Sequence, residues 1–286
     1  MVSEIKTVGI IGAGTMGQGI AQVCAQAGYT TMLFDVNADL AQKAASSIEK
    51  NMDEGIAKGK VTHEDKKVAL SKLKIVSELN QIKADLIIEA VVEQLDIKQK
   101  IFAQLEKMNE GKSILATNTS SIPVTQIAAG LKDPSRCIGL HFFNPAHIMK
   151  LVEVISGAAT NPDLIDQVKA FAISLKKTPV IAKDSPGFIV NRVARHYYVE
   201  ALQLLEENVA DVSTIDQLLE SSGFKMGPFR LMDLIGVDTN FSVTTSMYNG
   251  FHQNPKFRPS RIQEQKVNAG EWGRKTGKGF YDYPNH

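Results

Sequence analysis

The sequence predicts an α/β protein in which a doubly wound, mostly parallel sheet is followed by an all-α C-terminal domain. Two observations support this prediction. Short runs rich in β-branched residues alternate with helical patterns from Val8 to about Ile181, and the pattern after Gly187 is helical. The predicted strands are residues 8–11, 30–35, 86–89, 113–116, 137–140, 152–155 and 180–182.

The first predicted helix follows the first strand directly. Its apolar side chains are spaced by four, three and four residues, so they share one helix face. They are Met16, Ile20, Val23 and Ala27. Asn37 can cap a second helix, and the helical pattern after it continues to about residue 74, longer and more charged than a crossover needs. We therefore expect an inserted helical hairpin over residues 37–74.

A cluster of turn-forming residues at Asp184-Ser185-Pro186-Gly187 follows the last predicted strand. We place the domain boundary there, which gives a sheet domain of residues 1–185 and a helical domain of residues 186–286. A helical unit of this size, rich in Phe, Tyr and Met, can complete its core by pairing with a second copy. The sequence therefore predicts a homodimer formed through the C-terminal domain.

Composition excludes several function classes. The 286 residues include 32 Lys and Arg against 31 Asp and Glu, so the formal net charge of +1 gives no general attraction to nucleic acid or anionic lipid. No apolar run approaches a membrane span, and the start lacks the basic region of a signal peptide. Two cysteines and no zinc spacing fit a reducing compartment without a metal. We expect a cytoplasmic protein with no nucleic acid or membrane partner.

The segment Gly12-Ala13-Gly14-Thr15-Met16-Gly17 joins the first strand to the first helix and is typical of a Rossmann-type dinucleotide-binding loop. Its glycines permit a tight turn and a close approach to pyrophosphate, and the helix N-terminus supplies N–H groups. Asp35 is the last residue of the second predicted strand, near the place where a carboxylate accepts the adenosine ribose hydroxyls. Its charge would repel a 2′-phosphate, so NAD is favoured over NADP. The alternative is a glycine turn and an Asp cap that hold no cofactor.

Two further strand ends carry polar residues that could perform chemistry. Ser120 follows the strand of residues 113–116, and His141 follows that of residues 137–140. A dehydrogenase of alcohols needs a base near neutral pH, and histidine suits that task. Glu153, twelve residues later, can fold back to meet the imidazole, and Ser120 can hydrogen-bond the substrate oxygen. The alternatives are a satisfied core histidine, a solvated Glu153 and a Ser120 that only shapes a turn.

These segments together resemble the short-chain L-3-hydroxyacyl-CoA dehydrogenases, a family that includes 3-hydroxybutyryl-CoA dehydrogenases, over nearly the whole chain. The resemblance implies that His141 is the base, Glu153 its partner, and Ser120 and Asn191 contacts of the substrate. It also implies cofactor contacts at Glu93, Lys98, Asn118, Ser120, Asn144 and Lys275. The segments that carry it are residues 12–17, 118–121, 141–145, 149–154, 186–192, 226–228 and 277–281.

A coenzyme A substrate brings phosphates that need a local cation. A lysine cluster in the predicted hairpin is a candidate, with Lys58 the best match to the family. Its members are Lys58, Lys60, Lys66 and Lys67. The alternative is a solvated charged face.

Arg195 departs from the expected short-chain pattern. It lies four residues after Asn191 on one predicted helix, so the two side chains share a face. A butyryl tail needs no such cation, whereas a terminal carboxylate can be held by two parallel hydrogen bonds from arginine. This stretch, together with residues 238–246, also resembles the 3-hydroxyadipyl-CoA dehydrogenase branch of phenylacetate degradation. Arg195 could instead pair with an internal acid or a dimer partner.

We therefore expect NAD-dependent, reversible oxidation of an L-3-hydroxyacyl-CoA, either 3-hydroxybutyryl-CoA or 3-hydroxyadipyl-CoA, to the 3-oxoacyl-CoA. Two other classes fit parts of the pattern. One is an NAD-linked dehydrogenase of a free hydroxy acid, which would not depend on the CoA moiety. The other is a non-catalytic NAD-binding protein, which would be expected to lack the pair of His141 and Glu153.

Overall fold

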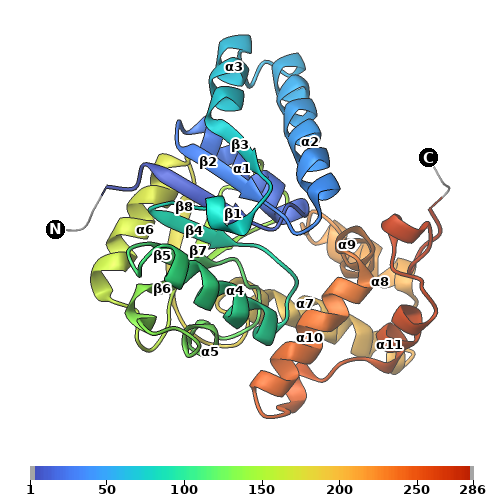
Figure 1. The fold of residues 1–286 in the computed structure, drawn as a ribbon. Helices are drawn as coiled ribbons and strands as arrows, with labels where there is room; N and C mark the ends of the chain where they lie inside the picture. Colours follow the sequence, from blue (N-terminus) through green and yellow to red (C-terminus); the bar gives the residue numbers. More distant parts are fainter. Residues whose placement is uncertain (1–3, 284–286) are drawn as a thin grey trace. The chain divides into compact units, whose positions relative to one another are not determined.

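A computed structural model describes residues 4–283 of the chain (Figure 1). The chain divides into two compact units between Ser185 and Pro186. The first unit combines a sheet with helices and the second is helical, so the predicted fold class is confirmed.

The first unit is built on an eight-stranded sheet with the order β3-β2-β1-β4-β5-β6-β7-β8. Neighbouring strands are parallel except for β6 and β7, which are antiparallel. The order reverses between β1 and β4, and such a reversal opens a crevice at the carboxyl ends of the strands. The strands are β1 (Thr7–Ile11), β2 (Thr30–Phe34), β3 (Leu73–Val76), β4 (Leu86–Glu89), β5 (Ile114–Thr117), β6 (Cys137–Phe142), β7 (Leu151–Ser156) and β8 (Thr178–Lys183).

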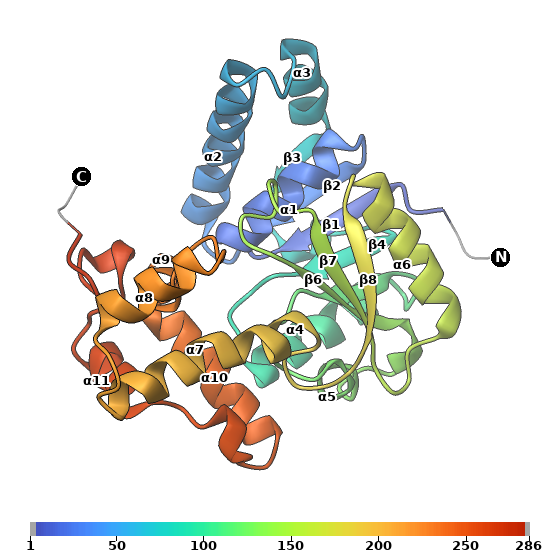
Figure 2. The ribbon, with the colours of Figure 1, turned by 180° about the vertical axis from the view of Figure 1, so that it is seen from behind.

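Helices cover both faces of this sheet. On one face α1 (Thr15–Gln26) and α6 (Pro162–Ser174) share a continuous hydrophobic core with the strands, in which Ile20, Ile88 and Val168 are fully buried. On the other face lie α4 (Leu95–Met108) and α5 (Val124–Ala128), as the two opposite views show (Figures 1 and 2). Apolar side chains on both faces of the central strands explain why those strands read as continuous hydrophobic runs.

A helical hairpin of α2 (Ala38–Ala57) and α3 (His63–Lys72) follows β2. Asn37 accepts a hydrogen bond from the Asp39 amide at 3.0 Å and caps α2. The predicted span of residues 37–74 is slightly too long, because Leu73 and Lys74 belong to β3. That strand was missed because it has four residues, half of them exposed, and directly follows a charged helix.

The second unit consists of helices packed around Tyr198, Ile215, Phe229 and Met232. A buried carboxylate, Asp216, accepts the amide of Phe229 at 2.9 Å and so caps the first turn of α9. The helices are α7 (Val190–Glu206), α8 (Val212–Ser221), α9 (Pro228–Ile235), α10 (Val237–Gly250) and α11 (Arg261–Asn268).

Across both units, single 3₁₀ turns occur at Leu79–Gln81, Pro134–Arg136, Pro255–Phe257 and Arg274–Thr276. Within residues 4–283, none of the helices has the length and apolar character needed to cross a membrane.

Candidate active site

The glycine loop after β1 has three glycines in three different environments. Gly12 has φ +98°, and a Cβ there would lie 2.6 Å from the carbonyl oxygen of Ala90. A Cβ on Gly17 would overlap the carbonyl oxygen of Gly12, so this glycine lets α1 pack on the loop. At Gly14, in contrast, a Cβ would meet no atom of residues 4–283 within 4 Å. Two glycines therefore serve the fold, while the third keeps open space beside the backbone.

That open space lies at the start of α1. The helix begins at Thr15, and its N-cap, Gly14, offers no side chain to the first amide groups in the described chain. Uncapped N–H groups together with the helix dipole favour an anionic group, so the loop fits the pyrophosphate of a dinucleotide. Met16 lies one residue further along the same first turn and is partly buried.

Asp35 lies directly after β2 and has two contacts in the structure. One carboxylate oxygen accepts the Ala13 amide at 2.7 Å, and the other accepts the Asn37 amide at 2.8 Å. The carboxylate therefore ties the glycine loop to the end of β2 as well as standing where a ribose could reach it. The sequence reading predicted the ribose contact but not this bracing of the loop.

His141 and Glu153 face each other across the antiparallel pair of β6 and β7. They occupy directly paired positions in the strand register. The imidazole Nδ1 lies 2.8 Å from Glu153 Oε2, and the residues are 6% and 1% exposed. The change of strand direction between β6 and β7 brings together residues twelve positions apart. The ring nitrogen Nε2 is then the one presented away from the carboxylate.

The loop after β5 is held by a carboxylate from the loop between β4 and α4. Glu93 Oε1 accepts the hydroxyl of Thr119 at 2.6 Å and the amide of Ser120 at 2.9 Å. On the other side, Asn118 Oδ1 accepts the amide of Phe142 at 2.8 Å, which links the loop to β6. Ser120 follows β5, His141 lies near the end of the neighbouring β6, and Asn118 connects the two elements. The prediction that His141 follows its strand is corrected, because β6 extends to Phe142 through its pairing with β7.

Lys98, predicted as a cofactor contact, is buried at 1% exposure on α4. Its Nζ lies 2.6 Å from Glu89 Oε1 and 3.2 Å from Glu93 Oε2. Burial alone would raise the pKa of Glu93, but the charge of Lys98 and hydrogen bonds from Thr119 and Ser120 outweigh burial and lower the pKa. Glu89 was missed in the sequence. The one feature of the sequence that could have pointed to Glu89 is its place as an acidic residue at the end of an apolar strand.

The remaining predicted contacts are spread over both units. In the first unit, Asn144 is exposed in the loop after β6. In the second unit, Asn191 is partly buried in the first turn of α7. Lys275 follows Arg274 in a 3₁₀ turn, and its Nζ lies 2.6 Å from Asp238 Oδ1. The cofactor and substrate roles of these three residues stay predictions.

Arg195 is buried inside the second unit, at 2% exposure. Its Nη1 donates to the Asn240 carbonyl oxygen at 3.1 Å and to Thr244 Oγ1 at 3.0 Å. Its guanidinium lies over the Tyr198 ring, 5.2 Å from the centroid, and burial lowers the pKa of Arg195 to about 10. Within residues 4–283 its Nε has no hydrogen-bond partner. The guanidinium is thus only partly satisfied by α10.

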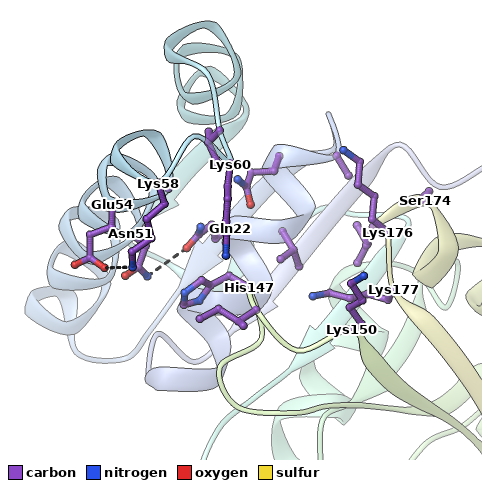
Figure 3. Close-up of a pocket in the computed structure, with 17 residues that line it drawn as sticks. Gln22, Asn51, Glu54, Lys58, Lys60, His147, Lys150, Ser174, Lys176 and Lys177 are labelled. Atoms are coloured by element: carbon purple, nitrogen blue, oxygen red, sulfur yellow. Dashed lines mark hydrogen bonds and ion pairs between the residues drawn. The ribbon is translucent and has the colours of Figure 1, made fainter.

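A cationic cavity of about 420 Å³ lies beside the hairpin in the first unit (Figure 3). Lys58, at the C-terminal end of α2, faces it, with a side chain 64% exposed and Nζ 3.8 Å from Glu54 Oε2. Lys66, a member of the predicted cluster, is instead held by Asp53 at 2.7 Å. The cations that line the cavity, together with His147, are Lys58, Lys60, Lys150, Lys176 and Lys177. The last three were missed because they are remote in sequence.

Metal-binding geometry was sought across residues 4–283. In that part of the chain, no group of three or more His, Cys, Asp or Glu side chains is placed to hold a metal ion.

The fold and the residues at the carboxyl ends of the parallel strands define an NAD-binding oxidoreductase of the Rossmann type. Residues 7–185 match the family described as "3-hydroxyacyl-CoA dehydrogenase, NAD binding domain", and residues 187–283 match "3-hydroxyacyl-CoA dehydrogenase, C-terminal domain". The chain belongs to the 3-hydroxyacyl-CoA dehydrogenase family of NAD-dependent oxidoreductases. The family predicted from the sequence and its NAD cofactor are therefore confirmed.

Individual relatives agree over the full length of this chain. It is 46% identical over 285 residues to a 3-hydroxyadipyl-CoA dehydrogenase of Escherichia coli (strain K12). The matched region is 99% of this chain, so the chain spans about 60% of the length of that relative. A 3-hydroxybutyryl-CoA dehydrogenase of Bradyrhizobium diazoefficiens is 40% identical, with 99% and 97% coverage. The crystal structure of a (S)-3-hydroxybutyryl-CoA dehydrogenase from Ralstonia eutropha has a TM-score of 0.94 at 40% identity, with 99% and 100% coverage.

Proposed function

We propose that this protein catalyses the reversible oxidation of an L-3-hydroxyacyl-CoA to the 3-oxoacyl-CoA. One observation supports this reaction above the others. The pairing of His141 with Glu153 at 2.8 Å lies on the sheet edge to which the glycine loop also belongs, since β1 and β6 run in the same direction. A base and a cofactor loop on one edge are what alcohol oxidation requires.

In this mechanism NAD, when bound, supplies the hydride acceptor. Nε2 of His141 takes the proton of the 3-hydroxyl group as the C–H bond at the same carbon breaks, and the C=O bond forms. The Glu153 carboxylate, bonded to Nδ1, fixes the tautomer and stabilises the imidazolium. Ser120 hydrogen-bonds the 3-oxygen from the braced loop, and Asn191 is a second predicted substrate contact. The released proton and the reduced cofactor balance the reaction.

The CoA moiety is assigned to the cavity beside the hairpin. CoA carries an adenosine 3′-phosphate and a pyrophosphate, and five lysines line the cavity, with Glu54 as the one acidic side chain among the described residues of its lining. Lys177 is the buried member of this set and donates to the carbonyl oxygens of Ala146 and Met149. Lys58 is the contact predicted from the sequence. Because the lysines come from α2, the loop after it and the region around β7 and β8, the positive charge is a property of the folded chain (Figure 3).

For the acyl chain we propose acceptance of a terminal carboxylate, as in 3-hydroxyadipyl-CoA. The observation behind this is a buried guanidinium on Arg195 that lacks an ion-pair partner among residues 4–283 and keeps an unbonded Nε. A buried charge of this kind is expensive without a counter-ion. The alternative role, anchoring α10 through Asn240 and Thr244, leaves 3-hydroxybutyryl-CoA as the preferred substrate.

These alternatives are separated by comparing kcat/KM for the two substrates in Arg195→Ala and in Thr244→Val, which removes one anchoring bond but no charge. An equal loss on both substrates in Arg195→Ala would remove the carboxylate role. A larger loss on 3-hydroxyadipyl-CoA, absent from Thr244→Val, supports that role.

A homodimer through the second unit is part of the proposal. Apolar side chains remain exposed on its helices, including Val193 at 70% and Leu218 at 67%. A second copy of the chain would cover them. Light scattering at micromolar concentration tests this, and a monomeric mass would contradict it. Two buried free cysteines, Cys24 and Cys137, fit the reducing conditions of a cytoplasm.

The first experiment follows NADH oxidation by the purified protein with acetoacetyl-CoA, with free acetoacetate, and with NADPH in place of NADH. Turnover that requires both CoA and NADH is expected. Activity on the free acid alone would establish the alternative of a free hydroxy acid dehydrogenase. Binding of NADH with no turnover on either acetoacetyl-CoA or a carboxylated 3-oxoacyl-CoA would establish a non-catalytic protein.

A further inference from the structure

Glu89, the last residue of β4, is a fully buried carboxylate that accepts hydrogen bonds from α4, from β5 and from its own following loop. Its Oε1 accepts the Lys98 ammonium at 2.6 Å and the amide of Val91 at 2.8 Å. Its Oε2 accepts the Thr117 hydroxyl at 2.8 Å. Because α4 and β5 both donate to it, this carboxylate has one fixed position.

Lys98 connects Glu89 to a second carboxylate. Its ammonium also lies 3.2 Å from Glu93, whose other oxygen holds the amide of Ser120. We call Glu89, Lys98 and Glu93 the triad. Two carboxylates and one ammonium leave one negative charge in excess. Since Glu89 alone would neutralise Lys98, the second carboxylate is not needed to balance the buried ammonium.

The excess charge lies on the nicotinamide side of the crevice, an assignment that rests on the proposed function. Glu89 pairs in register with Ile11, which immediately precedes the glycine loop. Asp35 places the adenosine half beyond β2, on the other side of β1, so the nicotinamide half extends toward β4 and β5. The nicotinamide ring is positively charged in NAD⁺ and uncharged in NADH.

We propose that Glu89 is a positioning residue which, through Lys98 and Glu93, strengthens the binding of NAD⁺ relative to that of NADH. A negative charge fixed beside the nicotinamide attracts the cationic ring of NAD⁺ and has no net charge to act on in the reduced ring. Glu89 holds Lys98 away from the nicotinamide and so leaves the charge of Glu93 effective. The same contacts hold the Ser120 loop in place for the substrate oxygen.

The test is Glu89→Gln, which has the same shape and removes one negative charge. The amide oxygen can still accept from Lys98 and Val91, and the amide nitrogen can donate to Thr117. Dissociation constants for NAD⁺ and NADH are measured by calorimetry. We expect the constant for NAD⁺ to rise about tenfold and that for NADH to change less than about twofold. An unchanged ratio of the two constants would overturn the proposal.

Three matched variants separate charge from structure. Glu89→Asp keeps the charge and should keep the ratio close to that of the wild type. Thr117→Val removes a hydrogen bond to Glu89 without a change of charge, so kcat can fall while the ratio stays. Glu110→Gln removes an exposed charge, 73% exposed, from the turn after α4 and should change neither constant. A ratio shifted in Thr117→Val as much as in Glu89→Gln would contradict a role for charge.

If Glu89→Gln does not fold, Glu93→Gln removes the same charge from a side chain that is 35% exposed. It should shift the ratio in the same direction, and an unchanged ratio would again overturn the proposal. The proposed function fails separately. If the wild-type protein binds neither NAD⁺ nor NADH, that function is wrong, whereas normal binding with an unaltered ratio in both variants disproves only the role of Glu89.

Discussion

Two clusters of charged side chains lie near the carboxyl ends of the parallel strands, and they differ in their contacts. The pair of His141 and Glu153 joins two antiparallel strands and keeps one imidazole nitrogen directed away from its carboxylate. The triad of Glu89, Lys98 and Glu93 uses its charges on one another and on a loop. In the proposed function the first cluster exchanges a proton with the substrate, whereas in the further inference the second acts on the cofactor through position and charge.

The largest effect is expected from loss of the base. His141→Ala should lower kcat by about 10³-fold, because a positioned general base contributes roughly 10²–10⁴ in rate. Cofactor affinity should stay within about twofold, since the glycine loop and the triad are untouched. Steady-state kinetics with acetoacetyl-CoA and calorimetry with NADH give both quantities. A variant that keeps a tenth or more of the wild-type kcat would show that another group takes the proton.

Glu153→Gln is expected to lower kcat by about 10²-fold, because the amide can hold the ring but cannot stabilise an imidazolium by charge. The double variant with His141→Ala should be no slower than His141→Ala alone. Additive losses in that comparison would mean that Glu153 acts independently of the histidine.

Substitutions of Gly12 and Gly14 separate an effect on the stability of the fold from an effect on cofactor binding. Gly14→Ala should weaken NADH binding about tenfold with little change in thermal unfolding, because its Cβ meets no protein atom within residues 4–283. Gly12→Ala should lower stability by about 1–3 kcal/mol, because φ is +98° and the Ala90 carbonyl oxygen is close. Thermal melts with and without NADH distinguish them, and equal destabilisation would show that Gly14 also serves the fold.

Much of the site could be predicted because its signals are local in sequence. The glycine loop is a continuous segment, Asp35 directly follows a strand, and His141 belongs to a run of buried β residues. The order of strands and helices follows from the hydrophobic patterns, which is why the fold class was confirmed. The exception is β3, whose four residues are too few and too exposed to show a pattern.

The parts that were missed depend on contacts between elements. Glu89 reads only as the end of a strand, and its importance lies in Lys98 on the next helix and Thr117 on the next strand. Arg195 was singled out because it departs from the family pattern, and helical spacing placed it near Asn191. Neither signal reveals its burial or its bonds to residues 45 and 49 positions later. Side-chain partners across elements require the three-dimensional packing.

The smallest effect concerns an exposed charge, in contrast to the buried carboxylate of Glu89. Lys58→Ala should raise KM for acetoacetyl-CoA about threefold at low salt, and the effect should fade near 0.5 M salt, because a side chain 64% exposed is readily screened. Lys100→Ala is the matched control. Lys100 is 75% exposed and pairs with Asp96 four residues earlier, as Lys58 pairs with Glu54.

The CoA assignment requires that KM respond in Lys58→Ala and not in Lys100→Ala. The same salt series applied to Glu89→Gln should leave the ratio of NAD⁺ to NADH affinities nearly constant, since salt screens a buried charge only weakly. If the change in the affinity ratio caused by Glu89→Gln disappeared with salt, as the Lys58 effect should, the charge of Glu89 would be screened by solvent ions. That result would contradict the contrast between a buried and an exposed charged site.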